Sequence, residues 1–295
     1  MKKFAPLFVI IAASLWGIDG IVLRPALYSL PVTVVVLIES AIVAFFLTPF
    51  LYKNINKIKS LSRKEWLAFG GVALFGGAIG TMAITKALFF VNYVNLSVVI
   101  LIQKLQPVFA LALAALLLKE RLPKIFFLWA SIAIIGAYLM TFGLSFPNFS
   151  AGDKTTVAVA LSLIAAISFS SSTVFSKIGL KNIGYEFGTY LRFLFSTIIM
   201  ILLVASFGEF GSIANVTAIQ WGVFLIIAFT TGGAAIFLYY YGLKNISASV
   251  ATICELAFPL TAVILDYLIH ENILSMIQWV GVAILVFSIV KVSQL

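Results

Sequence analysis

Long apolar segments alternate with short polar connections along the whole chain. Because the hydrocarbon core of a bilayer is about 30 Å thick, a helix needs roughly 20 apolar residues to cross it. Ten segments of suitable length can be marked, at about residues 4–24, 32–52, 66–91, 95–118, 125–146, 155–178, 185–207, 218–243, 246–268 and 273–292. The connections between them are too short for a soluble domain. The pattern predicts an all-α integral membrane protein with ten transmembrane helices.

The composition supports this prediction and excludes several other classes of protein. Apolar residues make up 63% of the 295 residues and charged residues only 10%, with a mean hydropathy of +1.17. In a soluble domain, about a quarter of the residues are charged. The single cysteine, Cys254, excludes an intramolecular disulfide framework, and the single histidine, His270, excludes a multi-histidine metal site. No cofactor is expected.

The net charge of +9 predicts an orientation in the membrane rather than a nucleic-acid partner. The basic residues are spread over short connections and do not gather on one soluble face. Most fall on one side of the predicted membrane: Lys2, Lys3, Lys53, Lys57, Lys59, Arg63, Lys64, Lys119, Arg121, Lys124, Lys181, Lys244 and Lys291. The opposite side has little beyond Arg24 and Lys154. Since cytoplasmic connections carry the excess of lysine and arginine, both termini are predicted to be cytoplasmic.

The two halves of the sequence repeat. Four segments of the first half match four of the second in the same order: 12–27 with 165–180, 66–77 with 221–233, 101–109 with 253–261, and 116–129 with 267–279. The first match pairs Arg24 with Lys177. Five predicted spans per half place the second copy upside down in the membrane. We therefore expect residues 1–148 and 149–295 to form two inverted repeats, with a substrate site near the midplane between them.

Three segments carry a family resemblance. They are "SLWG" at 14–17, "LLLKERLPKIFFLWASIAIIGAYLM" at 116–140, and its echo "HENILSMIQWVGVAILVFSIV" at 270–290. With the repeat, they make the whole chain resemble the EamA-type families of the drug/metabolite transporter superfamily. The resemblance implies two inverted five-helix repeats around a cavity lined mainly by helices 3, 4, 8 and 9, with helices 1, 2, 6 and 7 completing it. It also implies alternating-access transport of a small metabolite.

Each half places a proline and polar side chains inside a predicted span. In "ICELAFPL", Glu255 lies four positions before Pro259, and in the matching span Gln103 lies four positions before Pro107. Proline has no amide proton and clashes with the carbonyl four residues earlier. Each proline is therefore expected to kink its helix and to leave that carbonyl free. Gln106 shares a helical face with Gln103 and Pro107.

Polar groups that face lipid would lack hydrogen-bond partners, so these two faces should meet a polar cavity or each other. Glu255 is the leading candidate for a carboxylate that binds an amine or couples transport to protons. Gln103 and Gln106 are candidates for contact with the substrate. The alternative for all three is a buried hydrogen bond between helices that serves packing alone.

Further charged residues lie within or near the predicted spans. Lys104 lies at a similar depth to Glu255, and an isolated lysine there costs about 2.5–3.5 kcal/mol, so a partner such as Glu255 or Glu39 is expected. Lys86 either faces the cavity or reaches the nearby interface. Glu39 and Arg192 occupy corresponding places in the second and seventh spans, where they provide two opposite anchors in the cavity or form a salt bridge between the halves. Two acids near predicted span ends are expected to be solvated: Asp19 and Asp266.

Aromatic side chains are expected in or near the same cavity. They come from Trp16 and from the run "FLYYYG", which contains Tyr239 and Tyr240. Aromatic faces bind organic cations and flat apolar groups. Because Tyr239, Tyr240 and Tyr241 are consecutive, only one or two of them can line the cavity, and the rest are expected at the membrane interface.

Three classes of function compete: a secondary transporter, an intramembrane enzyme, and a passive channel or scaffold. The sequence has no GxSG or GxGD protease signature and no set of metal ligands, and a scaffold would not explain buried charges at matched depths. With no ATP-binding motif, transport must be driven by gradients, with protons as the candidate coupling ion. Charges of both signs favour an amino acid or related zwitterion as substrate, while an organic cation or a phosphorylated anion are the alternatives. The chain is expected to be a multi-pass protein of a prokaryotic cell membrane.

Overall fold

The computed structural model describes residues 4–58, 61–89, 103, 105–145, 153–270 and 274–295, which form helices and no strand. Eight helices in these ranges are long and apolar enough to cross a membrane: Ala5–Leu27, Val32–Asn56, Arg63–Ala87, Thr156–Gly179, Tyr185–Phe207, Ala218–Asn245, Ala248–Ile269 and Met276–Ser293. Two shorter apolar helices, Gln106–Leu118 and Lys124–Met140, lie in the other two predicted segments. Ten complete spans, and the division into repeats at residue 148, stay predictions.

The described elements are helices of three kinds: α-helices, 3₁₀-helices and π-helices. Those of the first half are α1 (Ala5–Ile18), the π-helix η2 (Asp19–Leu23), the 3₁₀-helix η3 (Arg24–Leu27), α2 (Val32–Ile58), α3 (Arg63–Gly71), the π-helix η4 (Val72–Gly80), α4 (Thr81–Phe89), α6 (Gln106–Leu113), the π-helix η5 (Ala114–Leu118) and α7 (Lys124–Phe142). Those of the second half are α8 (Asp153–Gly179), α9 (Tyr185–Phe207), the 3₁₀-helix η6 (Glu209–Asn215), α10 (Ala218–Ile227), the π-helix η7 (Ala228–Gly232), α11 (Gly233–Asn245), α12 (Ala248–Cys254), α13 (Ala257–His270) and α14 (Met276–Ser293).

Capping boxes fix where three of these helices begin. In α3 the Ser62 hydroxyl accepts a hydrogen bond from the Glu65 backbone N–H, and the Glu65 side chain accepts one from the Ser62 backbone. Such reciprocal bonds satisfy N–H groups that a helix leaves without partners at its N-terminus. The same arrangement begins two further helices: Thr217 with Gln220 in α10, and Ser275 with Gln278 in α14.

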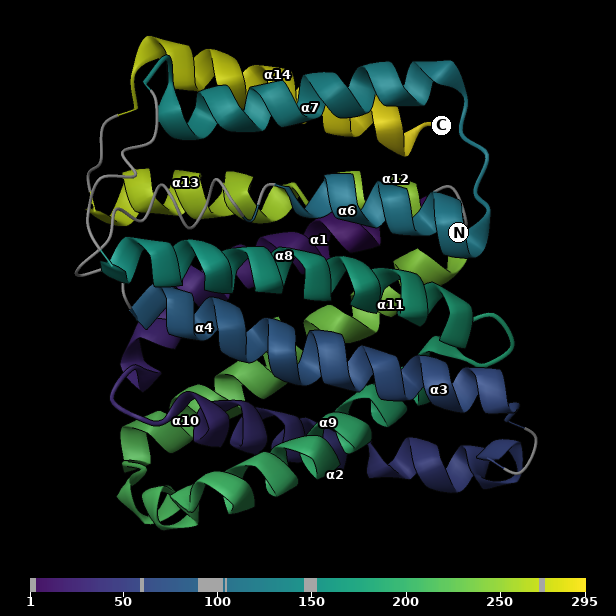
Figure 1. The fold of residues 1–295 in the computed structure, drawn as a ribbon, viewed down its shortest axis with the longest axis vertical. Helices are drawn as coiled ribbons and strands as arrows, with labels where there is room; N and C mark the ends of the chain where they lie inside the picture. Colours follow the sequence, from purple (N-terminus) through teal and green to yellow (C-terminus); the bar gives the residue numbers. More distant parts are fainter. Residues whose placement is uncertain (1–3, 59–60, 90–102, 104, 146–152, 271–273) are drawn as a thin grey trace.

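The helices run roughly along one common direction, from one end of the molecule to the other (Figure 1). α7 and α14 pack together along one edge, α2 and α9 lie along the opposite edge, and α1 packs between them against α11 and α13. The two chain termini lie at the same end, together with the connections that follow α2, η5, α8 and α11. Basic residues concentrate in these connections. The positive-inside rule predicts that this end faces the cytoplasm.

Glycines allow η4 to pack very closely against α8 and α9. A Cβ atom on Gly76 would lie 2.2 Å from Ser172 Oγ, and one on Gly77 would lie 1.9 Å from Ser196 Oγ. Both distances are shorter than van der Waals contact, so any larger residue would push the helices apart. Small residues serve the same purpose where membrane helices pack closely.

Candidate substrate-binding site

The helix that carries Glu255 is broken at that residue. α12 ends one residue before it and α13 begins two residues after it. Pro259, four residues further on, has no N–H to donate to the Glu255 carbonyl. That carbonyl was expected to be free, but it accepts a hydrogen bond from the Phe258 N–H at 2.9 Å. The chain therefore tightens into a turn that satisfies its backbone, and the polar group left for a ligand is the carboxylate.

The carboxylate of Glu255 accepts hydrogen bonds from three helices. Gln106 of α6 donates from Nε2 to Oε2 at 2.7 Å, and the Tyr239 hydroxyl of α11 donates to Oε1 at 2.6 Å. Thr173 Oγ1 of α8 lies 3.4 Å from the same Oε1 and 3.0 Å from the Tyr239 hydroxyl. Hydrogen bonds to an ionised acceptor are shorter and roughly twice as strong as bonds between neutral groups. Glu255 is thus the centre of a polar cluster that joins the two halves.

In the first half of the chain, the helix that contacts Glu255 is α6. α6 begins at Gln106 with Pro107 in its first turn, where a missing N–H costs no helical hydrogen bond. The Gln106 carbonyl accepts a hydrogen bond from Ser170 Oγ of α8 at 2.8 Å, while its side chain reaches Glu255. Gln106 is therefore held at both its backbone and its side chain.

A small cavity lies between the start of α6 and the break between α12 and α13. Its lining comes from both halves: Gln103, Gln106, Pro107, Thr252, Glu255, Leu256, Phe258 and Pro259. Its volume is about 40 Å³, room for only a few water molecules, since one water needs about 10–15 Å³. Thr252 Oγ1 is buried with no hydrogen-bond partner among the described residues. The structure thus gathers five of the predicted site residues, but a metabolite can enter only if the helices separate.

Of the predicted aromatic residues, Trp16 and Tyr239 lie next to the polar cluster. Their ring centroids are 5.3 Å apart, and the Tyr239 side chain, 3% exposed, contacts Glu255 directly. Tyr240 points elsewhere: its hydroxyl lies 2.9 Å from Ser176 Oγ, and its ring lies under Arg192, with 5.9 Å between the guanidinium carbon and the ring centroid. Among the described residues, neither Tyr240 nor Arg192 lines the cavity.

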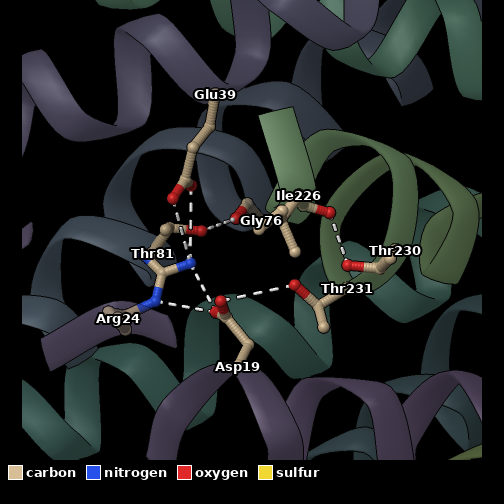
Figure 2. A network of polar contacts seen from close by, with 8 residues as sticks. All are labelled: Asp19, Arg24, Glu39, Gly76, Thr81, Ile226, Thr230 and Thr231. Carbon is tan, nitrogen blue, oxygen red and sulfur yellow. Dashed lines mark hydrogen bonds and ion pairs between the residues drawn. The ribbon is translucent and has the colours of Figure 1, made fainter. Parts of the chain in front are cut away.

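Glu39 belongs to a separate charge cluster (Figure 2). Arg24 forms ion pairs with both Asp19 and Glu39, with shortest distances of 2.6 and 3.2 Å. The expectation of a salt bridge between Glu39 and Arg192 is therefore wrong, because Glu39 is paired with Arg24. The expectation that Asp19 is solvated is wrong too. Asp19 is only 8% exposed, and Arg24 turns back toward it from η3.

The remaining predicted residues lie away from these clusters or outside the description. Lys104 is outside the described residues, as is the side chain of Asp266. Lys86 lies exposed in the last turn of α4, which fits a lysine that reaches the membrane interface.

Sequence reasoning missed the contribution of α8. Thr173 and Ser170 contact Glu255 and Gln106, while Ser176 contacts Tyr240. The signal was present in "SFSSSTVFSK" at 168–177, an unusually polar run inside an apolar span. Hydroxyl groups at such positions bond across helices in membranes.

Comparison with known proteins identifies the family. The EamA-like transporter family matches residues 3–142 and 156–294, which together are nearly the whole chain. This chain belongs to the EamA-like transporter family. Each of its two matched segments falls within one of the predicted halves.

Several relatives of this EamA-like transporter are similar over most of its length. The riboflavin transporter ImpX of Fusobacterium nucleatum is 45% identical over 290 residues, 98% of this chain and 97% of that protein. An uncharacterized transporter of Clostridium kluyveri is 24% identical over 88% of this chain and 83% of its own length. A crystal structure with 16% identity has a TM-score of 0.75 and covers 98% of this chain and 96% of its own, which shows the shared fold.

These findings place the protein in a class. It is a multi-pass membrane protein that transports a small metabolite, and its bacterial relatives indicate a prokaryotic membrane. The family resemblance seen in the sequence is thereby confirmed.

Proposed function

We propose that this EamA-like protein is a secondary transporter that carries riboflavin, or a metabolite with a similar flat and hydrogen-bonding ring, across a bacterial membrane. The observation that carries the proposal is the 45% identity with a riboflavin transporter over nearly the full length of both chains. An alignment of that extent keeps the helices that enclose the central cavity in register. The lining of the cavity is therefore expected to recognise a similar ligand.

The chemistry of the polar cluster supports a flavin. The isoalloxazine ring has carbonyl acceptors and one N–H donor along one edge, and its ribityl chain has several hydroxyls. Gln103 and Gln106 each offer an amide that donates and accepts, while the Glu255 carboxylate accepts. Trp16 and Tyr239 provide flat apolar faces beside these groups, as stacking on a ring requires.

A zwitterionic amino acid is less well supported than the sequence alone suggested. It would require a cation and an anion side by side in the cavity. Among the described lining residues, Glu255 is the one charged group. Glu39 is engaged with Arg24, and Arg192, although its charge acts on Glu255, lies over Tyr240 and outside the lining of the cavity.

Transport by alternating access fits the contact between the start of α6 and the break after α12, because the two elements come from opposite halves of the chain. The bond between Gln106 and Glu255 joins the halves, and the 40 Å³ cavity beside it is closed to metabolites. Small-molecule sites usually enclose about 300–1,000 Å³. We infer that the two helices separate at this bond to admit substrate, first toward one side of the membrane and then toward the other.

Uptake into liposomes tests the proposal. Purified protein is reconstituted, and entry of radiolabelled riboflavin is measured against protein-free liposomes. We expect saturable uptake that unlabelled riboflavin inhibits and that a mixture of amino acids or a quaternary ammonium ion does not. Flavin mononucleotide serves as a third competitor, because its phosphate tests the phosphorylated-anion alternative. If riboflavin neither enters nor exchanges while an amino acid does, the proposal is wrong.

A further inference from the structure

The cluster of Asp19, Arg24 and Glu39 contains two acids and one base. Asp19 begins η2, Arg24 begins η3, and Glu39 lies in the N-terminal third of α2 (Figure 2). Thr231 of η7, from the second half of the chain, donates to Asp19 Oδ1 at 3.3 Å. The side chains of Arg24 and Glu39 are each 12% exposed. The cluster is therefore a nearly buried group of charges where the two halves meet.

Arg24 is shared unequally between the two acids. Its Nη2 and Nε lie 2.6 and 2.8 Å from Asp19 Oδ2. Its Nη2 lies 3.2 and 3.4 Å from the two oxygens of Glu39, at the long end of hydrogen-bonding distance. Among the described residues, Glu39 Oε1 and Arg24 Nη1 are buried without any hydrogen-bond partner. Asp19 thus receives the closer contacts of the guanidinium, and Glu39 is the acid whose charge Arg24 compensates less.

The charges that act on Glu39 are those of Arg24 and Asp19. Of the elements packed against α2, the described residues of η4, η7 and α10 contain no charged residue. The acid of η6, Glu209, bonds to Thr33 instead, and Lys86 of α4 is exposed. Beyond these, α9 contributes Arg192 over Tyr240, Tyr28 follows η3, and the side chain of Asp266 on α13 lies outside the description.

Two ionised carboxylates and one guanidinium leave one net negative charge. An unpaired charge inside a protein or membrane costs several kcal/mol, and an acid can avoid that cost by holding a proton. We propose that Glu39 binds a proton in this conformation and releases it when the cluster opens to water, so that a proton gradient drives transport. The proton forms an O–H bond on the Glu39 carboxyl group, and no other bond changes.

The position of the cluster explains how one proton can drive a conformational change. α2 packs against α9, and Thr231 links the cluster to η7, so movement between the halves changes the surroundings of Asp19 and Glu39. A neutral Glu39 lets the halves close on a cluster with no net charge. An ionised Glu39 favours a conformation in which water reaches the cluster. The coupling of this proton to flavin movement rests on the proposed function, whereas the protonation itself does not.

Infrared spectroscopy tests the protonation without any substrate. The C=O stretch of a protonated carboxyl group is recorded for the purified protein over a pH titration. We expect one such band to be present in Glu255→Gln and absent in Glu39→Gln. The band should also be absent in Asp19→Asn, although Glu39 is still there, because Arg24 is then free to neutralise it. Both variants are made in the Glu255→Gln background, so that Glu255 cannot supply the band. A band that persists there in either Glu39→Gln or Asp19→Asn overturns the proposal, and the second variant keeps the test valid if the first does not fold.

Transport measurements test the coupling. An imposed pH gradient should stimulate riboflavin accumulation by the wild type and have no effect on Glu39→Gln, while exchange of labelled for unlabelled riboflavin continues in that variant. Glu186→Gln, an acid at the start of α9, is the matched control and should respond to the gradient as the wild type does. If the wild type exchanges riboflavin but ignores the gradient, the coupling is wrong and the proposed function stands. If no flavin moves at all, the proposed function fails, and the infrared titration alone decides the proton site.

Discussion

Gln106 Nε2 lies 2.7 Å from Glu255 Oε2, although the two residues are 149 positions apart in the sequence. One belongs to the first half of the chain, where Gln106 begins α6, and the other to the second half, where Glu255 directly follows α12. A hydrogen bond between an amide and a carboxylate at this point can break and re-form without exposing either group to lipid. It is therefore suited to a contact that opens and closes during transport.

Replacing Glu255 by glutamine should weaken flavin binding. The variant keeps the shape of the side chain but removes the negative charge that accepts hydrogen bonds from Gln106 and Tyr239. It also replaces one carboxylate oxygen by an NH₂ group, which cannot accept the hydrogen bond that Gln106 donates. A hydrogen bond to a charged group contributes about 1.5–3 kcal/mol, so we expect affinity to fall roughly tenfold to a hundredfold. Quenching of riboflavin fluorescence by the purified protein measures the dissociation constant. An unchanged constant in Glu255→Gln would remove Glu255 from the binding site.

The two adjacent tyrosines offer a matched comparison. Tyr239→Phe and Tyr240→Phe each remove a buried hydroxyl that forms a hydrogen bond with α8. The partner of Tyr239 is Thr173, and the partner of Tyr240 is Ser176. An unsatisfied buried partner costs about 1–3 kcal/mol, so both variants should unfold at lower temperature. Only Tyr239→Phe should also weaken riboflavin binding, since only Tyr239 contacts Glu255. Equal binding losses in both variants would mean that the effect is general destabilisation.

The sequence predicted the central cluster because two independent signals coincide there. Glu255 and Gln106 are polar residues in apolar spans, and the repeat pairs their helices through Pro107 and Pro259. Polar groups in a membrane must find partners, so residues of this kind were bound to meet each other or a cavity. The sequence did not reveal that Gln106 and Glu255 bond to each other and leave a cavity of only about 40 Å³ beside them.

The cluster around Arg24 could not be predicted in the same way. Hydropathy places Asp19 and Arg24 near the end of the first span, where solvation is the usual outcome. In the structure a π-helix follows α1 directly, and the changed number of residues per turn alters the direction of the side chains that follow. Asp19 and Arg24 consequently face each other. A π-helix of this kind has no reliable sequence signal.

Adding a methyl group to Gly76 should destabilise the protein. The new Cβ of Gly76→Ala would lie 2.2 Å from Ser172 Oγ. Overpacking of this kind costs about 1–3 kcal/mol. The control is Gly70→Ala in α3, where nothing lies within 4 Å of the added atom, and helix propensity predicts a gain of roughly 0.8–1 kcal/mol. Thermal unfolding in detergent should therefore shift in opposite directions for the two variants, and shifts of the same sign would contradict the close packing of η4.

Glu120 should contribute to stability by capping α12. Its carboxylate accepts hydrogen bonds from the backbone N–H groups of Ala248 and Ser249 at 2.8 and 3.1 Å, and from Ser249 Oγ at 2.5 Å. Loss of a cap costs about 0.5–2 kcal/mol, so Glu120→Ala should lower the unfolding temperature. The neighbouring exposed residue provides the control, and Arg121→Ala should leave that temperature nearly unchanged. A larger loss in Arg121→Ala than in Glu120→Ala would exclude the capping role.

Replacing Arg24, the cation of the cluster with Asp19 and Glu39, should destabilise the protein far more than replacing Lys177, which the repeat pairs with Arg24. Arg24→Gln leaves Asp19 and Glu39 facing each other, and loss of one member of a buried ion pair costs about 3–5 kcal/mol. Lys177, which the repeat pairs with Arg24, donates instead to the neutral carbonyls of Leu243, Lys244 and Ile246 at 2.8, 3.1 and 2.5 Å. Its replacement by glutamine should cost only about 1–3 kcal/mol.

Arg24→Gln and Lys177→Gln should also differ in whether a second substitution, Asp19→Asn, restores their stability. Adding Asp19→Asn to Arg24→Gln removes the charge that Arg24 compensated, so the double variant should regain most of the lost unfolding temperature. The same substitution should not help Lys177→Gln, because the hydrogen-bond partners of Lys177 are neutral carbonyls and the acid that acts on it is Glu120, not Asp19. Thermal unfolding of the four proteins checks both statements. If Asp19→Asn restored both single variants equally, or neither, the buried charge imbalance would not be what holds Arg24 in place.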